Sequence, residues 1–310
     1  FQEKWGEKIE EVNGEWRVRE REAIDRARLK LEEKGIAFSP QPELLWSQRV
    51  VMDPPQLHAL KEAQKRSLEA FLATLPTIPF AKSEREVERT LEAELLKRSV
   101  WGLSFASIVA SGENGCTLHY SNNRAELQCN HLLLLDFGLK WGTLSSDISR
   151  TVPISGKFNP LQKMLYNIVL ETQSFHQSNV KEGVTLYQLN ERAWAFLENL
   201  LEERFFSRGG VAQREYKKAT HGISHLIGEQ VHEGDPFRLL NYSPLKAGMV
   251  ISNEPGLYGT FSIQLDGVNY HQKIGIRIED NLLVTKNGAV NLSAEFPHTA
   301  EEIESHFTSQ

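Results

Sequence analysis

Residues 221–233 read HGISHLIGEQVHE and contain three of the ten histidines of this 310-residue chain. The two glycines in this stretch disfavour a helix interior, because glycine loses more backbone entropy there than other residues do. Side chains alternate along a strand, so His221, Ile223 and His225 would share one face of an extended segment. The fold must therefore carry this segment in extended form. Taken alone, the pattern fits structural core histidines about as well as a functional cluster, and carboxylates elsewhere decide between the two.

The composition excludes several classes of protein. Hydrophobic residues make up 40% and charged residues 25%, which is the balance of a soluble globular protein of one or two domains. No apolar run approaches 18 residues, so we expect no membrane partner. The net charge is −6 without a basic cluster, which argues against nucleic acid. Cys116 and Cys129 cannot form a disulfide framework, so a reducing compartment, the cytoplasm, is expected.

The periodicity of apolar residues predicts helices in the first two thirds and strands mainly in the last third. Capping signals such as Asp53-Pro54, Ser83 with Glu86, and Asn159-Pro160 support the helices. Separate helices and antiparallel strands favour an α+β fold over a doubly wound sheet. We expect helices at 15–34, 53–75, from 83 onward, at 159–178 and at 185–203, a linker at 36–52, and strands at 131–137, 147–154, 219–226, 249–258 and 274–286.

Two aspartates lie at the ends of consecutive predicted strands. Asp136 ends the first strand, Asp147 opens the next, and Trp141-Gly142 lies midway between them. A hairpin turning there would pair the two aspartates directly, with Cβ atoms about 4.5–5.5 Å apart. Two facing carboxylates at a buried strand end must share a proton or bind a cation. The alternative is a different register that leaves both aspartates solvated.

Two glutamates complete the set of acidic candidates. Glu254 lies in ISNEPGLY and Glu279 in GIRIED. In the second motif three isoleucines share one face of the strand, whereas Gly275, Arg277 and Glu279 share the other, which indicates a core face and a polar site. Four carboxylates and a histidine suit two divalent cations, because oxygen ligands favour Mn²⁺, Mg²⁺ or Ca²⁺ and an imidazole shifts the preference toward a transition metal.

These residues resemble the pita-bread metallopeptidases, and most closely Xaa-Pro aminopeptidase (aminopeptidase P), with prolidase as a near relative. The resemblance covers about residues 53–305. It rests on five residues that occur in order in their own motifs: Asp136, Asp147, His225 in HGISH, Glu254 in NEPGLY and Glu279 in GIRIED. Further similar phrases are SGENGCTLHY at 111–120, SDISRTVPISGKF at 146–158 and KAGMVISNEPGLY at 246–258.

The resemblance implies an α+β pita-bread fold, with curved antiparallel sheets flanked by helices. Residues 53–310 would form the catalytic domain. Residues 1–52 would be a helical segment and linker, the remnant of an N-terminal domain that members of this family usually carry in full. The chain begins without Met, so we expect a trimmed or processed piece. Because the N-terminal part is shorter than in the family, the subunit contacts that a full domain would make stay open. A homo-oligomer is one of the alternatives. A smaller departure is Gln230 in GEQVHE, where the family more often has aspartate.

The resemblance also assigns roles. Asp136 would hold one metal and His225 and Glu254 the other, with Asp147 and Glu279 bridging both. The metals would be Mn²⁺, with Co²⁺ and Zn²⁺ as alternatives. A metal-bridging hydroxide would remove the N-terminal residue of peptides that have proline in second position. The histidines expected to contact substrate are His119, His221 and His232.

Chemical reasoning refines these roles. His232 would donate to the developing oxyanion and Glu254 would carry a proton to the leaving nitrogen. Arg277 would orient a carboxylate ligand. His119 has the alternative of an ordinary strand-end residue, and a cysteine nucleophile at Cys116 is disfavoured because no orienting group is identifiable.

Three other functions stay open: a prolidase acting on dipeptides, a peptide-binding module of the same fold, and a hydrolase of non-peptide esters. A dipeptidase needs a cation to grip the free carboxylate of its substrate. The segment between His232 and Gly248 offers only Arg238 and Lys246 for this purpose, which favours the aminopeptidase.

Overall fold

A computed structural model describes residue 26 and residues 29–36, 42–214, 221–234 and 239–308. The chain divides into two compact units, residues 1–45 and residues 46–310. The second unit carries all the predicted site residues. Within the described residues, no helix has the length and apolar character needed to cross a bilayer. The domain boundary proposed at residues 52 and 53 stays a prediction.

The helices begin where the sequence places their caps. Asp53, Asn159 and Thr185 each accept a hydrogen bond from the third residue of the following helix in a capping box. The helix predicted at 15–34 lies largely outside the described residues, and residues 42–49, predicted as linker, form a helix. The C-terminal helix α7 was not predicted. The helices are α2 (Pro42–Arg49), α3 (Pro54–Thr74), α4 (Glu84–Arg98), α5 (Pro160–Asn179), α6 (Leu186–Arg204) and α7 (Ala300–Thr308), with short 3₁₀ helices η1 (Leu75–Phe80), η2 (Gly112–Cys116), η3 (Phe206–Arg208) and η4 (Leu239–Tyr242).

The strands form antiparallel sheets throughout. Three sheets have the orders β1-β2-β5, β11-β10-β7 and β6-β8-β9, and β3 pairs with β4. This arrangement confirms the predicted α+β class. The strands are β1 (Ile108–Ser111), β2 (Leu132–Phe137), β3 (Lys140–Trp141), β4 (Leu144–Ser145), β5 (Ile148–Pro153), β6 (Val211–Arg214), β7 (Val250–Asn253), β8 (Gly256–Leu265), β9 (Val268–Arg277), β10 (Asp280–Val284) and β11 (Ala289–Asn291).

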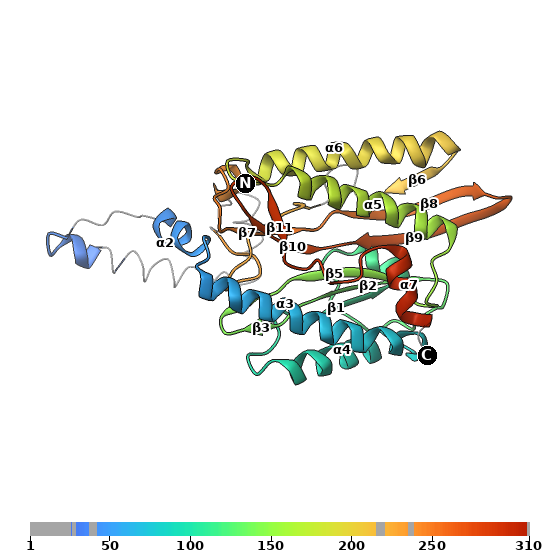
Figure 1. The fold of residues 1–310 in the computed structure, drawn as a ribbon, viewed down its shortest axis with the longest axis horizontal. Helices are drawn as coiled ribbons and strands as arrows, with labels where there is room; N and C mark the ends of the chain where they lie inside the picture. The colour runs from blue at the N-terminus through green and yellow to red at the C-terminus, as the bar shows by residue number, and fades with distance from the viewer. Residues whose placement is uncertain (1–25, 27–28, 37–41, 215–220, 235–238, 309–310) are drawn as a thin grey trace. The chain divides into compact units, whose positions relative to one another are not determined.

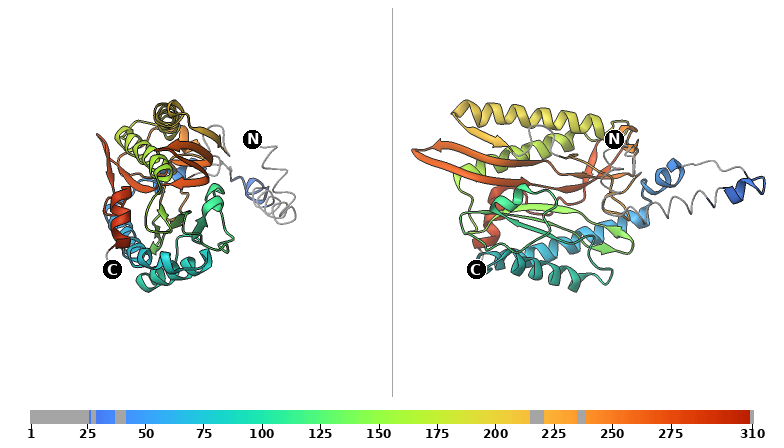
Figure 2. Two further views of the ribbon diagram at one scale, coloured as in Figure 1. Left: turned by 90° about the vertical axis from the view of Figure 1, so that its right-hand side faces the viewer. Right: turned by 180° about the vertical axis from the view of Figure 1, so that it is seen from behind.

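Helices cover the sheets on two sides. Figure 1 shows α5 and α6 along the sheet of β8 and β9, and α3 and α4 along the sheet of β1, β2 and β5. The view from behind in Figure 2 shows the same two pairs of helices enclosing the strands. One continuous apolar core joins these layers, with Phe71 of α3, Phe137 of β2 and Phe261 of β8 among its fully buried members. The strand ends that carry polar residues meet between the two sheets.

The predicted direct pairing of Asp136 with Asp147 is wrong by two residues. Asp136 pairs with Ser149 across β2 and β5. Trp141 pairs with Leu144, which puts the hairpin turn at Gly142 and Thr143. Gly142 has φ +62°, a conformation that favours glycine, so the turn is centred one residue later than expected. A shift of two residues keeps both aspartates on the same face of the sheet.

Of the strand predicted at 219–226, residues 219 and 220 lie outside the described residues, and residues 221–226 form no strand beyond isolated bridges at Leu226. Its last residues instead run beside β7 as an irregular segment: the amide of Ser252 donates to the carbonyl of His225, and the amide of Glu254 to that of Ile223. The strand predicted at 249–258 is divided into β7 and β8 at Glu254-Pro255, because proline cannot donate to a ladder.

The sequence also contains a hairpin signal that the predicted strands leave out. The long strands β8 and β9 meet at Asp266-Gly267, both with positive φ. Asp-Gly between alternating residues is among the strongest hairpin signals, because both turn positions require left-handed backbone. The strand predicted at 274–286 therefore omits the first six residues of β9, which begins at Val268. It is also divided into β9 and β10 by Ile278 and Glu279.

Candidate metal centre

Three predicted ligands form a compact group between the sheets. One ligand atom from each of Asp147, His225 and Glu279 lies within 4.8 Å of the other two. The Nε2 atom of His225 lies 3.5 Å from Oδ2 of Asp147 and 3.9 Å from Oε1 of Glu279. The same nitrogen lies 3.2 Å from Oε1 of Glu254, which adds a third carboxylate to the cluster.

Asp136 reaches the cluster from β2 through a chain of hydrogen bonds. Arg277 donates from Nη2 to Oδ2 of Asp136 at 2.6 Å and from Nε to Oγ of Ser149 at 2.8 Å. The Ser149 hydroxyl in turn donates to Oε2 of Glu279 at 2.8 Å. Asp136 is thus linked through Arg277 and Ser149 to the group of the other four predicted ligand residues.

Each carboxylate ligand lies where a strand starts or stops. Asp136 is the next-to-last residue of β2, and Asp147 immediately precedes β5. Glu254 follows the end of β7, and Glu279 lies between β9 and β10. At a strand end, the backbone is fixed by the hydrogen bonds of the sheet, while the side chain can extend beyond the sheet to bind a ligand. The fold therefore presents four carboxylates from four strand ends to one point.

Burial makes this charge cluster costly. Asp136, Asp147 and Glu279 have exposed fractions of 8%, 4% and 2%. Burial raises the pKa of Asp147 well above its usual range, and the charge of Asp136 adds to this. Burial likewise raises the pKa of Glu279 well above its usual range, together with the charge of Asp147. Without a cation, burial and mutual repulsion therefore favour the protonated forms of these two carboxyl groups.

Glu254 and His225 carry opposite charges, and each shifts the pKa of the other. Burial by itself would raise the pKa of Glu254, but hydrogen bonding to His225 and the nearby His221 lower that pKa to about 2. Burial would lower the pKa of His225, but Glu254 and Asp147 raise it to about 9. In the absence of metal, the protonated imidazole of His225 thus supplies positive charge to the cluster.

The residues present fit a divalent metal. Oδ1 of Asp136 and Oε1 of Glu279 are buried and have no hydrogen-bond partner among the described residues. A buried carboxylate oxygen without a donor is unfavourable unless a cation binds it. Oxygen ligands with one imidazole match the preference of a first-row transition metal.

The other predicted histidines surround the cluster. The rings of His225 and His232 are 4.3 Å apart, and those of His119 and His232 are 6.3 Å apart. His119 and His232 are exposed, whereas His221 is half-buried. Nδ1 of His221 lies 3.6 Å from Oε2 of Glu254. The three histidines therefore lie on the solvent side of the carboxylates, where a substrate can reach them.

The loop of His119 is held close to the site by two features. Glu84, fully buried, accepts hydrogen bonds from residues on both sides of this histidine, including Ser111, Asn114 and Tyr120. A Cβ at Gly275 would lie 2.1 Å from the backbone of Gly115, so the close approach of η2 to β9 requires glycine. The close approach of these two backbones explains why the polar face of the strand has glycine at position 275.

Two residues of the site were not predicted from the sequence. Tyr258 lies with its hydroxyl 3.1 Å from Nε2 of His221 and accepts from Nη1 of Arg277 at 3.3 Å. Burial raises the pKa of this hydroxyl to about 12, so it stays protonated at neutral pH. Ser149 is the cross-strand partner of Asp136. The correct register would have identified Ser149, and the NEPGLY motif contains Tyr258.

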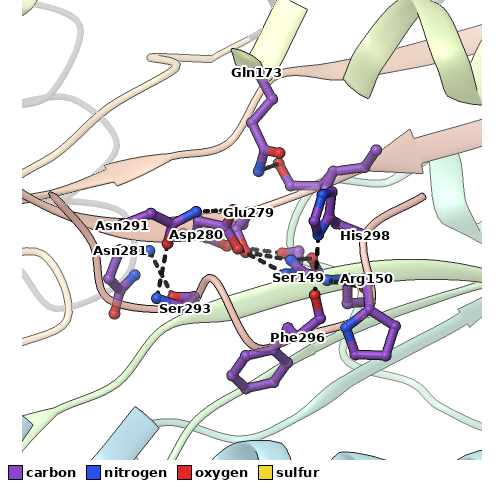
Figure 3. A network of polar contacts seen from close by, with 12 residues as sticks. Ser149, Arg150, Gln173, Glu279, Asp280, Asn281, Asn291, Ser293, Phe296 and His298 are labelled. Carbon is purple, nitrogen blue, oxygen red and sulfur yellow. Dashed lines mark hydrogen bonds and ion pairs between the residues drawn. The ribbon is translucent and has the colours of Figure 1, made fainter. Parts of the chain in front are cut away.

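A further polar network lies behind the centre (Figure 3). Arg150 is fully buried and donates to the carbonyls of Glu279 at 2.6 Å and Pro297 at 2.9 Å. It also pairs with Oδ1 of Asp280 at 2.7 Å. Since the amide of Glu279 donates to the carbonyl of Ser149, the main chain of this glutamate is fixed on both sides.

Comparison with known proteins identifies the family of this chain. The profile of metallopeptidase family M24 matches residues 58–286. The Xaa-Pro aminopeptidase of Haemophilus influenzae is 30% identical over 266 residues, which are 84% of this chain and 61% of the relative. That of Escherichia coli is 30% identical over 261 residues, 83% of this chain and 59% of the relative. The chain thus spans about three fifths of the length of these relatives.

Solved structures extend the comparison to the fold. Zinc-substituted E. coli aminopeptidase P in complex with product superposes with a TM-score of 0.70 at 28% identity, over 84% of this chain and 60% of that one. The same enzyme with the inhibitor Pro-Leu gives a TM-score of 0.76 at 25% identity, over 96% and 70%. These matches confirm the predicted pita-bread fold. The chain belongs to metallopeptidase family M24, a family of metal-dependent hydrolases, and resembles its Xaa-Pro aminopeptidases.

Proposed function

We propose that this chain is the catalytic part of an Xaa-Pro aminopeptidase that uses two divalent metal ions, with Mn²⁺ favoured over Co²⁺ and Zn²⁺. The observation that carries the proposal is the buried cluster of three carboxylates around His225, with Asp136 linked to it through Arg277 and Ser149, which needs added positive charge. The names of the relatives and the Pro-Leu inhibitor of a structural neighbour support the proline specificity.

Asp136, Asp147, His225, Glu254 and Glu279 would hold the metal ions. Metal bound there would lower the pKa of water from 15.7 toward about 7 and would polarise a substrate carbonyl. Arg277 keeps Asp136 in place through its bond to Oδ2. The hydrogen-bonded partners Ser149 and Arg277 link Asp136 to Glu279, so the positions of these two carboxylates depend on each other.

The remaining groups handle protons and charge. Glu254 has a lowered pKa and an oxygen near His221, so it is ionised and placed to accept a proton and pass it to the proline nitrogen. His232, exposed beside His225, donates to the oxyanion that develops on the scissile carbonyl. His119 and His221 orient the substrate, and the Tyr258 hydroxyl holds His221.

Prolidase is the second candidate, because it would use the same site on dipeptides. Its carboxylate clamp would have to come from Arg238 or Lys246. Arg238 lies outside the described residues, and the Lys246 side chain is exposed. A freely exposed lysine holds a carboxylate weakly, so we favour an open site that accepts longer peptides.

A metal-supplemented assay of X-Pro-Y tripeptides, X-Pro dipeptides and X-Ala-Y peptides tests the proposal. We expect tripeptides to be hydrolysed at least as fast as dipeptides, and X-Ala-Y peptides to be cleaved poorly. Cleavage of X-Pro alone, abolished by Arg238→Ala, would assign the chain to prolidase. Metal binding without hydrolysis of any of these peptides would favour a binding module or an esterase.

The proposal extends to location. The chain has only two cysteines, Cys116 and Cys129, too few for a disulfide framework in a chain of this size. This cysteine usage fits a reducing compartment, and we propose the cytoplasm.

A further inference from the structure

Helix α5 sends one buried polar side chain to the back of the candidate metal centre. Gln173 is only 4% exposed. Its Nε2 donates to the carbonyl of Asn253 at 3.3 Å and to the carbonyl of Ile278 at 3.1 Å. Asn253 and Ile278 immediately precede Glu254 and Glu279. One amide group therefore joins the two segments that carry two of the proposed ligands.

The contact is reciprocal. Nδ2 of Asn253 donates to the backbone carbonyl of Gln173 at 3.0 Å, so the helix and the strand end hold each other. Asn253 pairs with Asp280 in the ladder of β7 and β10. Beyond this pair the two chains stay side by side in the same register, since the amide of Ile278 donates to the carbonyl of Pro255 at 3.4 Å and Gly256 pairs with Arg277. The Gln173 side chain adds its two bonds at the gap between the β7–β10 and β8–β9 ladders, where Glu254 and Glu279 lie.

Nearby contacts fix each segment to other parts of the fold. The Glu279 segment is tied to β5 through Ser149 and Arg150, and Glu254 donates from its amide to the carbonyl of Ile223. Figure 3 shows Gln173 reaching toward the segment of Glu279 and Asp280 from the side opposite Arg150. The Gln173 amide adds a direct link between the two ligand segments, and both of its N–H groups are used in that link.

We propose that Gln173 is a positioning residue that sets the separation of the Glu254 and Glu279 carboxylates, and thereby the affinity of the centre for divalent metal. This inference rests on the proposed metal site and deepens it. Its physical basis is that hydrogen bonds behind metal ligands orient them, and their loss typically weakens metal binding about 10–100-fold. Because Gln173 lies behind the centre, its effect should be on metal and not on peptide.

Two substitutions separate the donor from the volume of the side chain. Gln173→Met keeps the length and removes both donors, whereas Gln173→Asn keeps an amide that is one methylene too short to reach both carbonyls. Thr172→Val is the matched control: Thr172 is fully buried on the same helix, and its hydroxyl donates only within that helix, to the carbonyl of Ile168.

The measurements are the Mn²⁺ affinity of metal-free protein by calorimetry, and its melting temperature without metal. We expect both Gln173 variants to bind Mn²⁺ about 10–100-fold more weakly than wild type, and Thr172→Val to bind it within about twofold. At saturating Mn²⁺, the KM for an X-Pro-Y peptide should change by no more than about twofold, because the substrate side of the site is unaltered.

The outcomes distinguish this inference from the proposed function. Gln173 variants that melt lower but bind Mn²⁺ as wild type does would show a purely structural residue and overturn the inference. Equal loss of affinity in Thr172→Val would overturn it too, since any buried change in α5 would then suffice. Wild-type protein that binds no divalent metal would overturn the metal site itself.

Discussion

At the scale of single residues, the histidines divide into those that face carboxylates and those that face solvent. His225 contacts three carboxylates, and two of them, Glu254 and Asp147, raise its pKa to about 9 against the effect of burial. His232 lies beside it but is exposed. Two imidazoles with rings 4.3 Å apart thus have separate environments, which predicts separate roles for them.

Substitution of these two histidines should have different effects. His232→Ala should keep the fold and the metal but lower turnover by roughly 10²–10³, as the loss of an oxyanion donor does. His225→Ala should weaken metal binding, because it removes the imidazole next to the carboxylates. Metal content after dialysis, measured beside turnover, checks this division. Equal loss of metal in both variants would contradict it.

His176 predicts an acid-sensitive fold. This histidine of α5 is 1% exposed and its Nε2 lies 3.0 Å from the Ser224 hydroxyl. Burial lowers its pKa from 6.5 to about 4. A folded-state pKa below the unfolded value means that the unfolded chain binds more protons, so stability present above pH 6.5 is lost as pH falls toward 4.

The loss from this one group should approach about 3 kcal/mol at pH 4. Denaturant unfolding of wild type and His176→Gln between pH 7 and 4 measures it. The glutamine cannot titrate, so the variant should show a shallower pH dependence. Parallel curves for the two proteins would refute the assignment to His176.

At the scale of elements, α2 anchors a loop of the site. Nη2 of Arg49 lies 3.0 Å from Oε2 of Glu233 and 3.0 Å from Oε2 of Glu229. The Glu233 side chain is fully buried and follows His232 directly. The amide of Gln230 also donates to the same carboxylate at 3.2 Å. Arg49, in the segment predicted as a linker, therefore supplies the positive charge that binds the two glutamates of the His232 loop.

Arg49→Met should loosen this loop. It leaves a buried carboxylate without its cation, which should lower the free energy of unfolding by about 1–3 kcal/mol. It should also lower kcat/KM by more than its effect on metal affinity, because the loop carries His232 and none of the proposed ligands. Lys163→Met is the control: it breaks an exposed ion pair with Glu301 and should cost less than about 1 kcal/mol. Unchanged kcat/KM in Arg49→Met would contradict the anchor.

At the scale of the whole molecule, the metal centre joins separate sheets. Its carboxylates come from the ends of β2, β5 and β7 and from the connection between β9 and β10, and these strands belong to three separate sheets. Cations at this point would therefore hold together layers that are distant in sequence. Metal that binds only the folded state stabilises it by mass action.

Chelation should therefore lower the melting temperature as well as remove activity. Metal at 100 times its Kd contributes about 2.7 kcal/mol per site, which corresponds to roughly 4 °C per site for a chain of this size. Asp147→Asn should melt at the same temperature with and without chelator. Asp53→Asn, which removes an equal charge from an exposed helix cap, should keep the wild-type difference. Identical wild-type melting curves with and without chelator would argue against buried metals.

The sequence by itself determined where several helices start and which face of one strand is polar. Capping residues such as Asp53 and Asn159 start helices through bonds to their own neighbours, so local sequence suffices to place them. The alternation of Ile274, Ile276 and Ile278 with Arg277 and Glu279 likewise separates core from site, because side chains alternate along a strand whatever lies beside it.

Only the tertiary structure decided which groups touch. The register of β2 against β5 depends on the left-handed turn at Gly142, so Asp136 pairs with Ser149 and not with Asp147. For the same reason, the sequence did not predict the contacts of Tyr258, Arg49 and Gln173. Each makes contacts across long stretches of chain, and a periodic pattern records which face a side chain takes but not which distant group faces it.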